Sequence, residues 1–183
     1  MKVLQVIDFM PKASGGARFV VNLAIQLKNK GVNVEVLLID GGESHFIDEL
    51  RKNDINIISL DHSINRFNPK YAYKVSKYLD KYDVIHVHIF PSSYQVAIAR
   101  TFNVNSAPIV FTEHNSFNRR ASNPFFKYIE KFIYSKFNHI VCLSDQVFSF
   151  VDENLKISHD KLSIIENAID SKKISKSPLL NKK

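Results

Sequence analysis

The sequence has a single cysteine, no tryptophan and no apolar run long enough to cross a bilayer. Cys142 cannot form an internal disulfide, which excludes the disulfide-stapled secreted domains and fits a reducing compartment. A membrane-spanning helix needs about 20 consecutive apolar residues, and no segment of the 183 residues approaches that length. The opening stretch, MKVLQVIDFM, reaches an acid too soon for a secretory signal. We therefore expect a cytoplasmic protein.

The glycine motifs of two large nucleotide-binding classes are also absent. The stretch ASGGARF follows the first apolar run, but its adjacent glycines do not have the G-x-G-x-x-G spacing of dinucleotide-binding proteins. Only the acid expected at the end of the second strand is present, as Asp40. The P-loop motif G-x-x-x-x-G-K-[S/T] does not occur. These absences disfavour a dinucleotide-dependent dehydrogenase and a P-loop enzyme.

Acidic residues are missing from the last part of the chain, and this decides how the net charge is interpreted. The formal charge is +7, but residues 171–183 contain five lysines and no acid, so residues 1–170 carry only +2. A nearly balanced body with a lysine-rich tail is not typical of a nucleic-acid-reading surface. We expect no nucleic-acid partner.

Apolar strand patterns alternate with helix patterns along the chain. Strands are predicted at 2–8, 32–40, 55–60, 83–89, 108–114, 139–144 and 161–170. Helices are predicted at 17–30, 44–52, 69–79, 92–102, 124–137 and 145–154. Asn68 is the predicted N-cap of the third, with Pro69 as its first residue, Ser92 or Ser93 caps the fourth, and Asn123 opens the fifth. This alternation predicts the α/β class: one doubly wound, Rossmann-like, mostly parallel sheet of six or seven strands with helices on both faces. We expect one domain over residues 1–170, followed by a lysine-rich tail over 171–183 that is a frayed end or the truncated start of a linker.

Gly15 and Gly16 fall at the carboxyl edge of the predicted sheet, directly before the first helix. Function in open parallel sheets is concentrated at this edge. Glycine allows close backbone approach, and the free N–H groups and dipole of a helix start can hold a phosphate or another anion. A plain tight turn would have the same sequence, so both interpretations stay open.

Three histidines are predicted at the ends of two strands. His86 and His88 are two residues apart and should share one strand face, and His114 ends a later strand. A zinc site would need three or four converging ligands. Structural or substrate-lining histidines are favoured over a metal site, and Cys142 is expected to be a core residue.

The segment 118–137, NRRASNPFFKYIEKFIYSKF, mixes basic and aromatic residues. One interpretation is a helix that packs Phe125, Ile129, Phe132 and Ile133 against the sheet. The other is a basic, aromatic face resting on an anionic membrane surface, which would make the protein peripheral to the inner face of the cytoplasmic membrane.

The order and spacing of five motifs resemble the N-terminal half of family-4 retaining glycosyltransferases. The motifs are SGGARFVVNLAIQLKNKGVNVEVLLID after the first strand, YDVIHVHIF, IVFTEHN, HIVCLSDQV and KLSIIENAID. The resemblance implies the GT-B arrangement, in which two doubly wound domains face each other across a cleft. The N-terminal domain then mainly holds the acceptor and the C-terminal domain the nucleotide sugar. It implies no cofactor and no metal, with the nucleotide sugar as co-substrate.

The resemblance also assigns roles to individual positions. His114 matches a cleft histidine of the family and is the predicted catalytic residue. The predicted substrate-binding residues are Gly15, Gly16, Arg18, His88, Glu113 and Asn115. Asn167 and Asp170 match the interdomain hinge, where Ala168 replaces the family's glycine.

The family's donor-binding groups belong to a C-terminal domain that the 183 residues do not contain. We therefore expect the isolated chain to be inactive, as a fragment, a truncated product or half of a split enzyme. As part of a two-domain enzyme it would transfer a sugar to a saccharide or lipid-linked acceptor in cell-envelope polysaccharide or glycolipid assembly. The alternative is a stand-alone, non-enzymatic module that binds a nucleotide, a saccharide or a membrane surface.

Overall fold

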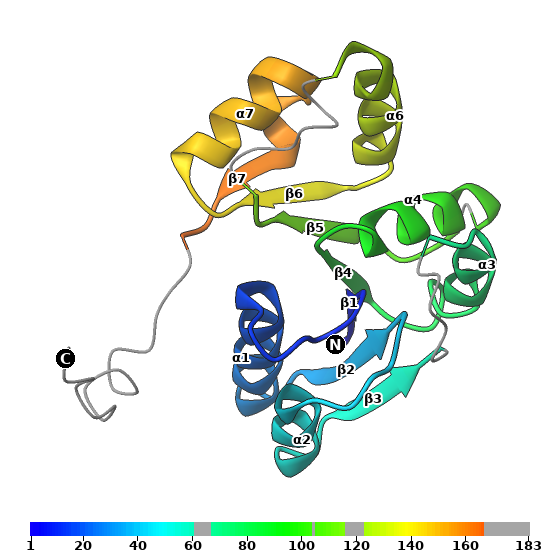
Figure 1. Ribbon diagram of the computed structural model, residues 1–183, viewed down its shortest axis with the longest axis vertical. Helices are drawn as coiled ribbons and strands as arrows, with labels where there is room; N and C mark the ends of the chain where they lie inside the picture. The colour runs from blue at the N-terminus through cyan, green and yellow to red at the C-terminus, as the bar shows by residue number, and fades with distance from the viewer. Residues whose placement is uncertain (61–66, 104, 116–122, 167–183) are drawn as a thin grey trace, which may run out of the picture.

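A computed structural model describes residues 1–60, 67–103, 105–115 and 123–166, which form a seven-stranded parallel sheet with helices on both faces (Figure 1). The strand order is β3-β2-β1-β4-β5-β6-β7, and every neighbouring pair is parallel. The strands are β1 (Lys2–Ile7), β2 (Asn33–Leu38), β3 (Asn56–Ser59), β4 (Val84–His88), β5 (Ile109–Glu113), β6 (His139–Cys142) and β7 (Leu162–Ile164). The predicted doubly wound α/β class is confirmed.

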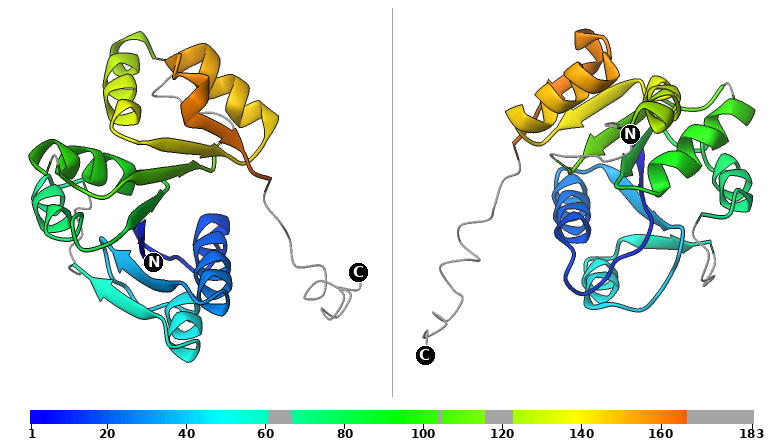
Figure 2. Two further views of the ribbon diagram at one scale, coloured as in Figure 1. Left: turned by 180° about the vertical axis from the view of Figure 1, so that it is seen from behind. Right: turned by 45° about the horizontal axis from the view of Figure 1, so that its top comes forward.

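The helices divide between the two faces at the point where the chain crosses from β3 to β4 (Figures 1 and 2). One face carries α1 (Gly15–Asn29) and α2 (His45–Lys52). The other carries α3 (Lys70–Ser76), α4 (Ser92–Phe102), α6 (Pro124–Ser135) and α7 (Asp145–Leu155). The strand order reverses between β1 and β4, and such switch points are where ligands bind in open α/β sheets.

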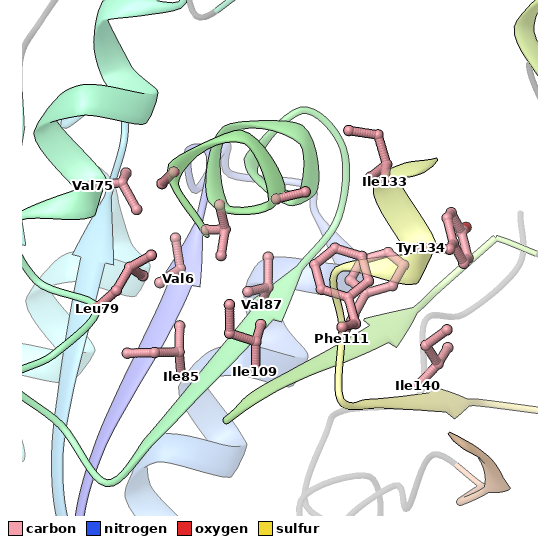
Figure 3. Close-up of a cluster of buried hydrophobic side chains, with 14 of the residues drawn as sticks. Val6, Val75, Leu79, Ile85, Val87, Ile109, Phe111, Ile133, Tyr134 and Ile140 are labelled. Atoms are coloured by element: carbon pink, nitrogen blue, oxygen red, sulfur yellow. The ribbon is translucent and has the colours of Figure 1, made fainter. Parts of the chain in front are cut away.

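Each face of the sheet has its own apolar core. The larger core packs β4, β5 and β6 against α3, α4, α6 and α7, and Figure 3 shows its centre, including Ile85, Val87 and Phe111. The smaller core packs α1 and α2 against β1 and β2. Ile85 and Val87 of β4 point into the larger core. Because side chains alternate along a strand, His86 and His88 point to the opposite face, which carries α1.

Of the three predicted helix starts, the one at Asn123 is confirmed. Asn123 caps α6, where its Oδ1 accepts from the backbone N of Phe125 at 2.9 Å. α3 begins one residue later than predicted, with Pro69 rather than Asn68 at the N-cap position, although Asn68 Oδ1 accepts from the backbone N of Lys70 at 3.0 Å. Ser92 does not cap α4: it lies inside the first turn, and its hydroxyl donates to the carbonyls at the end of β4.

The predicted packing face of α6 is also wrong. Ile133 is buried, but Phe125, Ile129 and Phe132 are exposed, and Glu130 and Tyr134 are buried instead. Two side-chain hydrogen bonds set this rotation. Tyr94 of α4 donates to Glu130, and Tyr134 donates to Glu113 of β5. An apolar-periodicity argument cannot detect such pairs, because it treats glutamate as a surface residue.

The C-terminal boundaries stay predictions. Asn167, Asp170 and the tail 171–183 lie outside the described residues. None of the helices in the described ranges is long and apolar enough to span a bilayer.

Candidate functional site

Three histidines meet at the carboxyl edge of the sheet, beside the first turns of α1. The rings of His86 and His88 are 4.1 Å apart between centroids, so they share one face of β4 as predicted. His114 follows β5, and its ring centroid lies 5.8 Å from that of His88. Phe19 of α1 packs on both rings, at 5.7 Å from His88 and 5.1 Å from His114. We call these four residues the histidine cluster.

Gly16 brings the start of α1 against this cluster. A Cβ at Gly16 would overlap Cδ1 of Ile89, lie 3.1 Å from its Cγ1, and lie 3.9 Å from Nδ1 of His114. Ile89 directly follows β4 and has a φ of +62°, which a β-branched residue rarely adopts. Strained backbone of this kind is concentrated at functional sites. A side chain at position 16 would therefore force the side chain of Ile89 to shift, and glycine avoids this where α1 meets the end of β4.

Gln5 of β1 orients His88. Nε2 of His88 donates to Oε1 of Gln5 at 2.5 Å, and both side chains are buried. Since an amide oxygen only accepts, this bond places the proton of the neutral ring on Nε2 and leaves Nδ1 as an acceptor. Nδ1 of His88 and Nε2 of His114 are buried without a hydrogen-bond partner among the described residues. Buried polar atoms are normally paired, so these two unpaired nitrogens are an unusual feature of the cluster.

Burial lowers the pKa of all three histidines. The pKa of His114 falls to about 4 for this reason. That of His86 falls to about 3, through burial and then repulsion from His114. The pKa of His88 is well below its usual value, mainly through burial, with repulsion from the other two rings. The cluster is therefore neutral at pH 7, and it offers hydrogen-bonding nitrogens rather than positive charge.

Glu113 and Asn115 lie behind the histidines, because Glu113 points to the face opposite His114. Oε2 of Glu113 accepts from Tyr134, and Oε1 accepts from the backbone N and side-chain Nδ2 of Asn115 at 2.9 and 3.3 Å. Burial raises the pKa of Glu113, and these hydrogen bonds partly counter the rise. The two residues are thus paired with each other and are not part of the histidine cluster.

Gly15 and Arg18 lie beside the cluster rather than in it. Gly15 is exposed, and a Cβ there would have nothing within 4 Å. Nη1 of Arg18 donates to Oε2 of Glu49 at 2.6 Å, and its guanidinium lies 4.6 Å from the ring centre of Phe46. Arg18 therefore ties α1 to α2, and its contact with a substrate stays a prediction.

Gly16, His88 and His114 are the predicted site residues that the fold brings together. Sequence reasoning missed Gln5, Phe19 and Ile89. Gln5 had a signal, since it is the one polar side chain in the apolar run VLQVI. Ile89 had none, because nothing in the sequence reveals a left-handed backbone at a β-branched residue.

Within the described ranges, no group of three or more His, Cys, Asp or Glu side chains could hold a metal ion. Cys142 is buried in β6, as predicted, and burial together with the nearby Glu113 raises the pKa of its thiol to about 11. A thiol this weakly acidic is a packing residue rather than a nucleophile.

An apolar pocket of about 310 Å³ opens at the same rim, on the face that carries α3, α4 and α6. Phe90, in its wall, directly follows Ile89, so the pocket adjoins the Gly16 contact. The lining is almost entirely apolar: Phe67, Pro69, Phe90, Pro91, Tyr94, Gln95, Ile98, Phe126 and Ile129.

The chain matches the family model described as Glycosyltransferase Family 4 over residues 13–173. A glycosyltransferase from Rickettsia africae is 25% identical, has a TM-score of 0.72, and matches 92% of this chain and 43% of its own. Anabaena Alr3699/HepE, in complex with UDP and glucose, is 16% identical, with a TM-score of 0.73 and coverages of 93% and 45%. The lipopolysaccharide outer core galactosyltransferase WaaB is 14% identical, with a TM-score of 0.69 and coverages of 92% and 46%.

The chain thus spans less than half the length of each of these three structures. No curated protein matches it.

Proposed function

We propose that this chain, which belongs to Glycosyltransferase Family 4 and has the fold of the N-terminal domain of GT-B enzymes, forms the acceptor side of a sugar-transfer site. The donor would be a nucleotide sugar, and the proposed transfer retains the anomeric configuration and uses no metal or other cofactor. Because the chain spans less than half the length of the matched structures, a second domain or polypeptide would supply the donor-binding half.

The observation that carries this proposal is the contact between the start of α1 and His114 at the switch point of the sheet. Gly16 lets the helix start approach the imidazole, where a Cβ at position 16 would be 3.9 Å from Nδ1. The first-turn N–H groups and dipole of α1 favour an anion such as the donor's diphosphate. Exposed Gly15 leaves that turn open on its outer side.

The neutral imidazole of His114 would position a sugar hydroxyl in this site. With its pKa lowered to about 4, His114 can donate or accept a hydrogen bond at neutral pH without carrying charge. Preorganised donors beside developing charge are a large part of enzymatic rate enhancement. Gln5 would act indirectly, by fixing the orientation of His88 behind His114.

The classes of donor and acceptor are supported by the names of the relatives. WaaB is named as a lipopolysaccharide outer core galactosyltransferase, and HepE was solved with UDP and glucose. We propose a saccharide or lipid-linked acceptor used in cell-envelope polysaccharide or glycolipid assembly. The apolar pocket beside Phe90 would accommodate hydrocarbon of a lipid-linked acceptor.

We also propose peripheral contact with an anionic membrane through the outer side of α6. Its large side chains are exposed rather than packed on the sheet: Phe125, Phe126, Tyr128, Ile129 and Phe132, here named the α6 aromatic face. Phe125 and Tyr128 are 76% and 77% exposed. Lys127, Lys131 and Lys136 are on the same helix or at its end. Aromatic side chains flanked by lysines favour an anionic lipid surface.

The test is sugar transfer in a reconstituted extract. Membranes and cytosol from source cells in which only the coding region of these 183 residues is deleted would supply the acceptor and any companion domain, and purified chain would be added with labelled nucleotide sugars. We expect the chain to restore transfer, and Gly16→Val and His114→Ala to abolish the restoration. No restoration by the wild-type chain would overturn the function. Equal restoration by both variants, with wild-type folding, would overturn the site.

A further inference from the structure

Phe19 is the side chain of α1 that covers the histidine rings. Its ring centre lies 5.1 Å from that of His114, with the two planes at 86°, and 5.7 Å from that of His88, with the planes at 57°. Phe19 comes three residues after Gly16 in α1, so both lie on one face of the helix, about one turn apart. The contacts of both residues show that this face is directed at the ends of β4 and β5.

The two ring nitrogens of His114 lie in different surroundings. Nε2 is buried and has no hydrogen-bond partner among the described residues. Nδ1 lies on the side of Gly16, 3.9 Å from the position that a Cβ there would take. Gly15, at the same helix start, is exposed. A bound group could reach Nε2 only by displacing the ring, so Nδ1 is the nitrogen through which His114 can meet a substrate.

The backbone around His114 is fixed from the opposite face of the sheet. Oε1 of Glu113 accepts from the backbone N of Asn115 at 2.9 Å, and Oε2 of Glu113 accepts from Tyr134 of α6. His114 therefore stands between two residues that bond to each other, and its ring changes direction by rotation about the side-chain bonds. A half turn of the ring would exchange Nδ1 with Cδ2 and take the nitrogen away from Gly16.

Phe19 is well placed to prevent this rotation. Its ring is closer to His114 than the ring of His88 is, at 5.1 Å against 5.8 Å between centres. The two planes are nearly perpendicular, which is an arrangement that aromatic rings prefer. A phenyl ring also keeps water from the surface it covers. Phe19 can therefore fix both the direction of the imidazole and its access to water.

We propose that Phe19 is a positioning residue, which holds the imidazole of His114 with Nδ1 toward the start of α1, and that a substrate hydroxyl bonds to this nitrogen. The inference rests on the proposed function for the identity of the substrate. Phe19 acts through His114 and does not itself contact the substrate. Each nitrogen of a neutral imidazole either donates or accepts a hydrogen bond, and a hydroxyl group can complement either state.

An NMR titration of the 183-residue chain tests the role of Phe19 without a transfer assay. Burial lowers the pKa of His114 to about 4. Phe19→Ala should raise this pKa by about one unit or more, because water then reaches the ring, whereas Phe19→Leu keeps most of the apolar volume and should stay close to the wild type. Phe148→Ala is the matched control, because Phe148 packs on His159 at 5.6 Å between ring centres. An unchanged pKa of His114 in a folded Phe19→Ala variant would overturn the role of Phe19.

The direction of the imidazole can be measured in the wild-type chain, so this measurement needs no variant. With Nδ1 toward Gly16, the proton on Cδ2 of His114 points away from that glycine and should give no nuclear Overhauser cross-peak with its α-protons. The ring protons of His114 should give cross-peaks with Phe19. A cross-peak from the Cδ2 proton to Gly16, or none to Phe19, would contradict the proposed orientation.

The reconstituted transfer assay tests which nitrogen the substrate uses. The side-chain amide nitrogen of asparagine can take the place of Nδ1 of histidine, and that of glutamine the place of Nε2. His114→Asn should therefore retain about tenfold more transfer than His114→Gln, the value of one hydrogen bond. Equal transfer by the two variants, or more by His114→Gln, would refute the contact through Nδ1. If the wild-type chain restores no transfer, the proposed function fails, and the NMR measurements still decide whether Phe19 positions His114.

Discussion

The side chain of Ile89 occupies the space that a β-carbon on Gly16 would need. Cγ1 of Ile89 would be 3.1 Å from that carbon, and Cδ1 would overlap it. Ile89 is held there by a left-handed backbone, with a φ of +62°. One glycine and one strained residue thus fix how closely the first helix approaches the end of the fourth strand, and the following predictions test this contact and its surroundings.

Gly16→Ala should be less stable than Gly15→Ala by about 1–3 kcal/mol, the usual cost of overpacking. Both glycines lie in the first turn of α1, so the gain in helix propensity is common to the two variants. Only the Gly16 variant meets Ile89. Urea denaturation measures the difference. Adding Ile89→Gly to each variant should remove most of it, and equal stabilities of the two alanine variants in the wild-type background would contradict the close contact.

Ser14→Ala should destabilise the protein by about 1 kcal/mol, because it removes the cap of α1. Ser44→Ala should be neutral or slightly stabilising, because its buried hydroxyl makes no hydrogen bond with the described residues. Thermal denaturation of the two variants side by side gives the comparison. A loss at Ser44 as large as that at Ser14 would mean that this hydroxyl has a partner in the protein.

Stability should fall between pH 6.5 and 5 because of the histidine cluster. The pKa values of His86, His88 and His114 are lowered in the fold, so below pH 6.5 the unfolded chain takes up protons that the folded chain does not. Each such group costs up to about 1.4 kcal/mol per pH unit. Glu113, whose pKa is raised, acts in the opposite direction. Urea denaturation against pH measures the slope.

His114→Asn should reduce this acid slope, since it removes one of the three histidines whose pKa is lowered in the fold. A slope equal to that of the wild type would contradict the lowered pKa of His114.

Tyr134→Phe should destabilise the protein by about 1–3 kcal/mol, since it removes the hydrogen bond to the buried carboxylate of Glu113. The pKa of Glu113 should then rise further, because a hydrogen bond that favours the charged form is lost. Carboxyl NMR titration measures the pKa. Tyr128→Phe, on the exposed side of the same helix, should change neither quantity.

Replacing Phe125, Tyr128 and Phe132 together by serine should reduce binding to anionic vesicles at least tenfold, because these rings are exposed in the free protein. Co-sedimentation with vesicles containing phosphatidylglycerol measures it, and higher salt should weaken the wild type. Phe102→Ser is the control, because it removes a ring that is 73% exposed at the C-terminal end of α4, outside the α6 aromatic face. Binding by the triple variant equal to wild type would rule out the α6 aromatic face as the contact.

The fold was predictable because its signals are local and repeated. Apolar runs at the strands and the helix-start hydrogen bonds of Asn68 and Asn123 follow from neighbouring residues. The rotation of α6 was not, because it depends on Glu130 and Tyr134 meeting partners on α4 and β5. Hydrogen bonds between segments far apart in the sequence therefore decide which face of α6 is buried, and apolar periodicity cannot predict them.

The candidate site was predictable in part for the same reason. Strand alternation put His86 and His88 on one face, and the family resemblance singled out Gly16 and His114. Gly16, His88 and His114 meet only because β1, β4 and β5 are neighbours in the sheet. Local patterns in a single sequence do not reveal this strand order. Arg18 shows the opposite case: its position in the motif gave no sign that Glu49 would hold it against α2.

The hydrogen bond between Gln5 and His88 joins two residues 83 positions apart in the chain, across the seam where β1 pairs with β4. Contacts at such long sequence separation form late and slowly, because loop closure must come first. The histidine cluster cannot assemble within either half of the chain alone. A nascent polypeptide therefore gains the histidine cluster only once β4 and β5 have both docked beside β1.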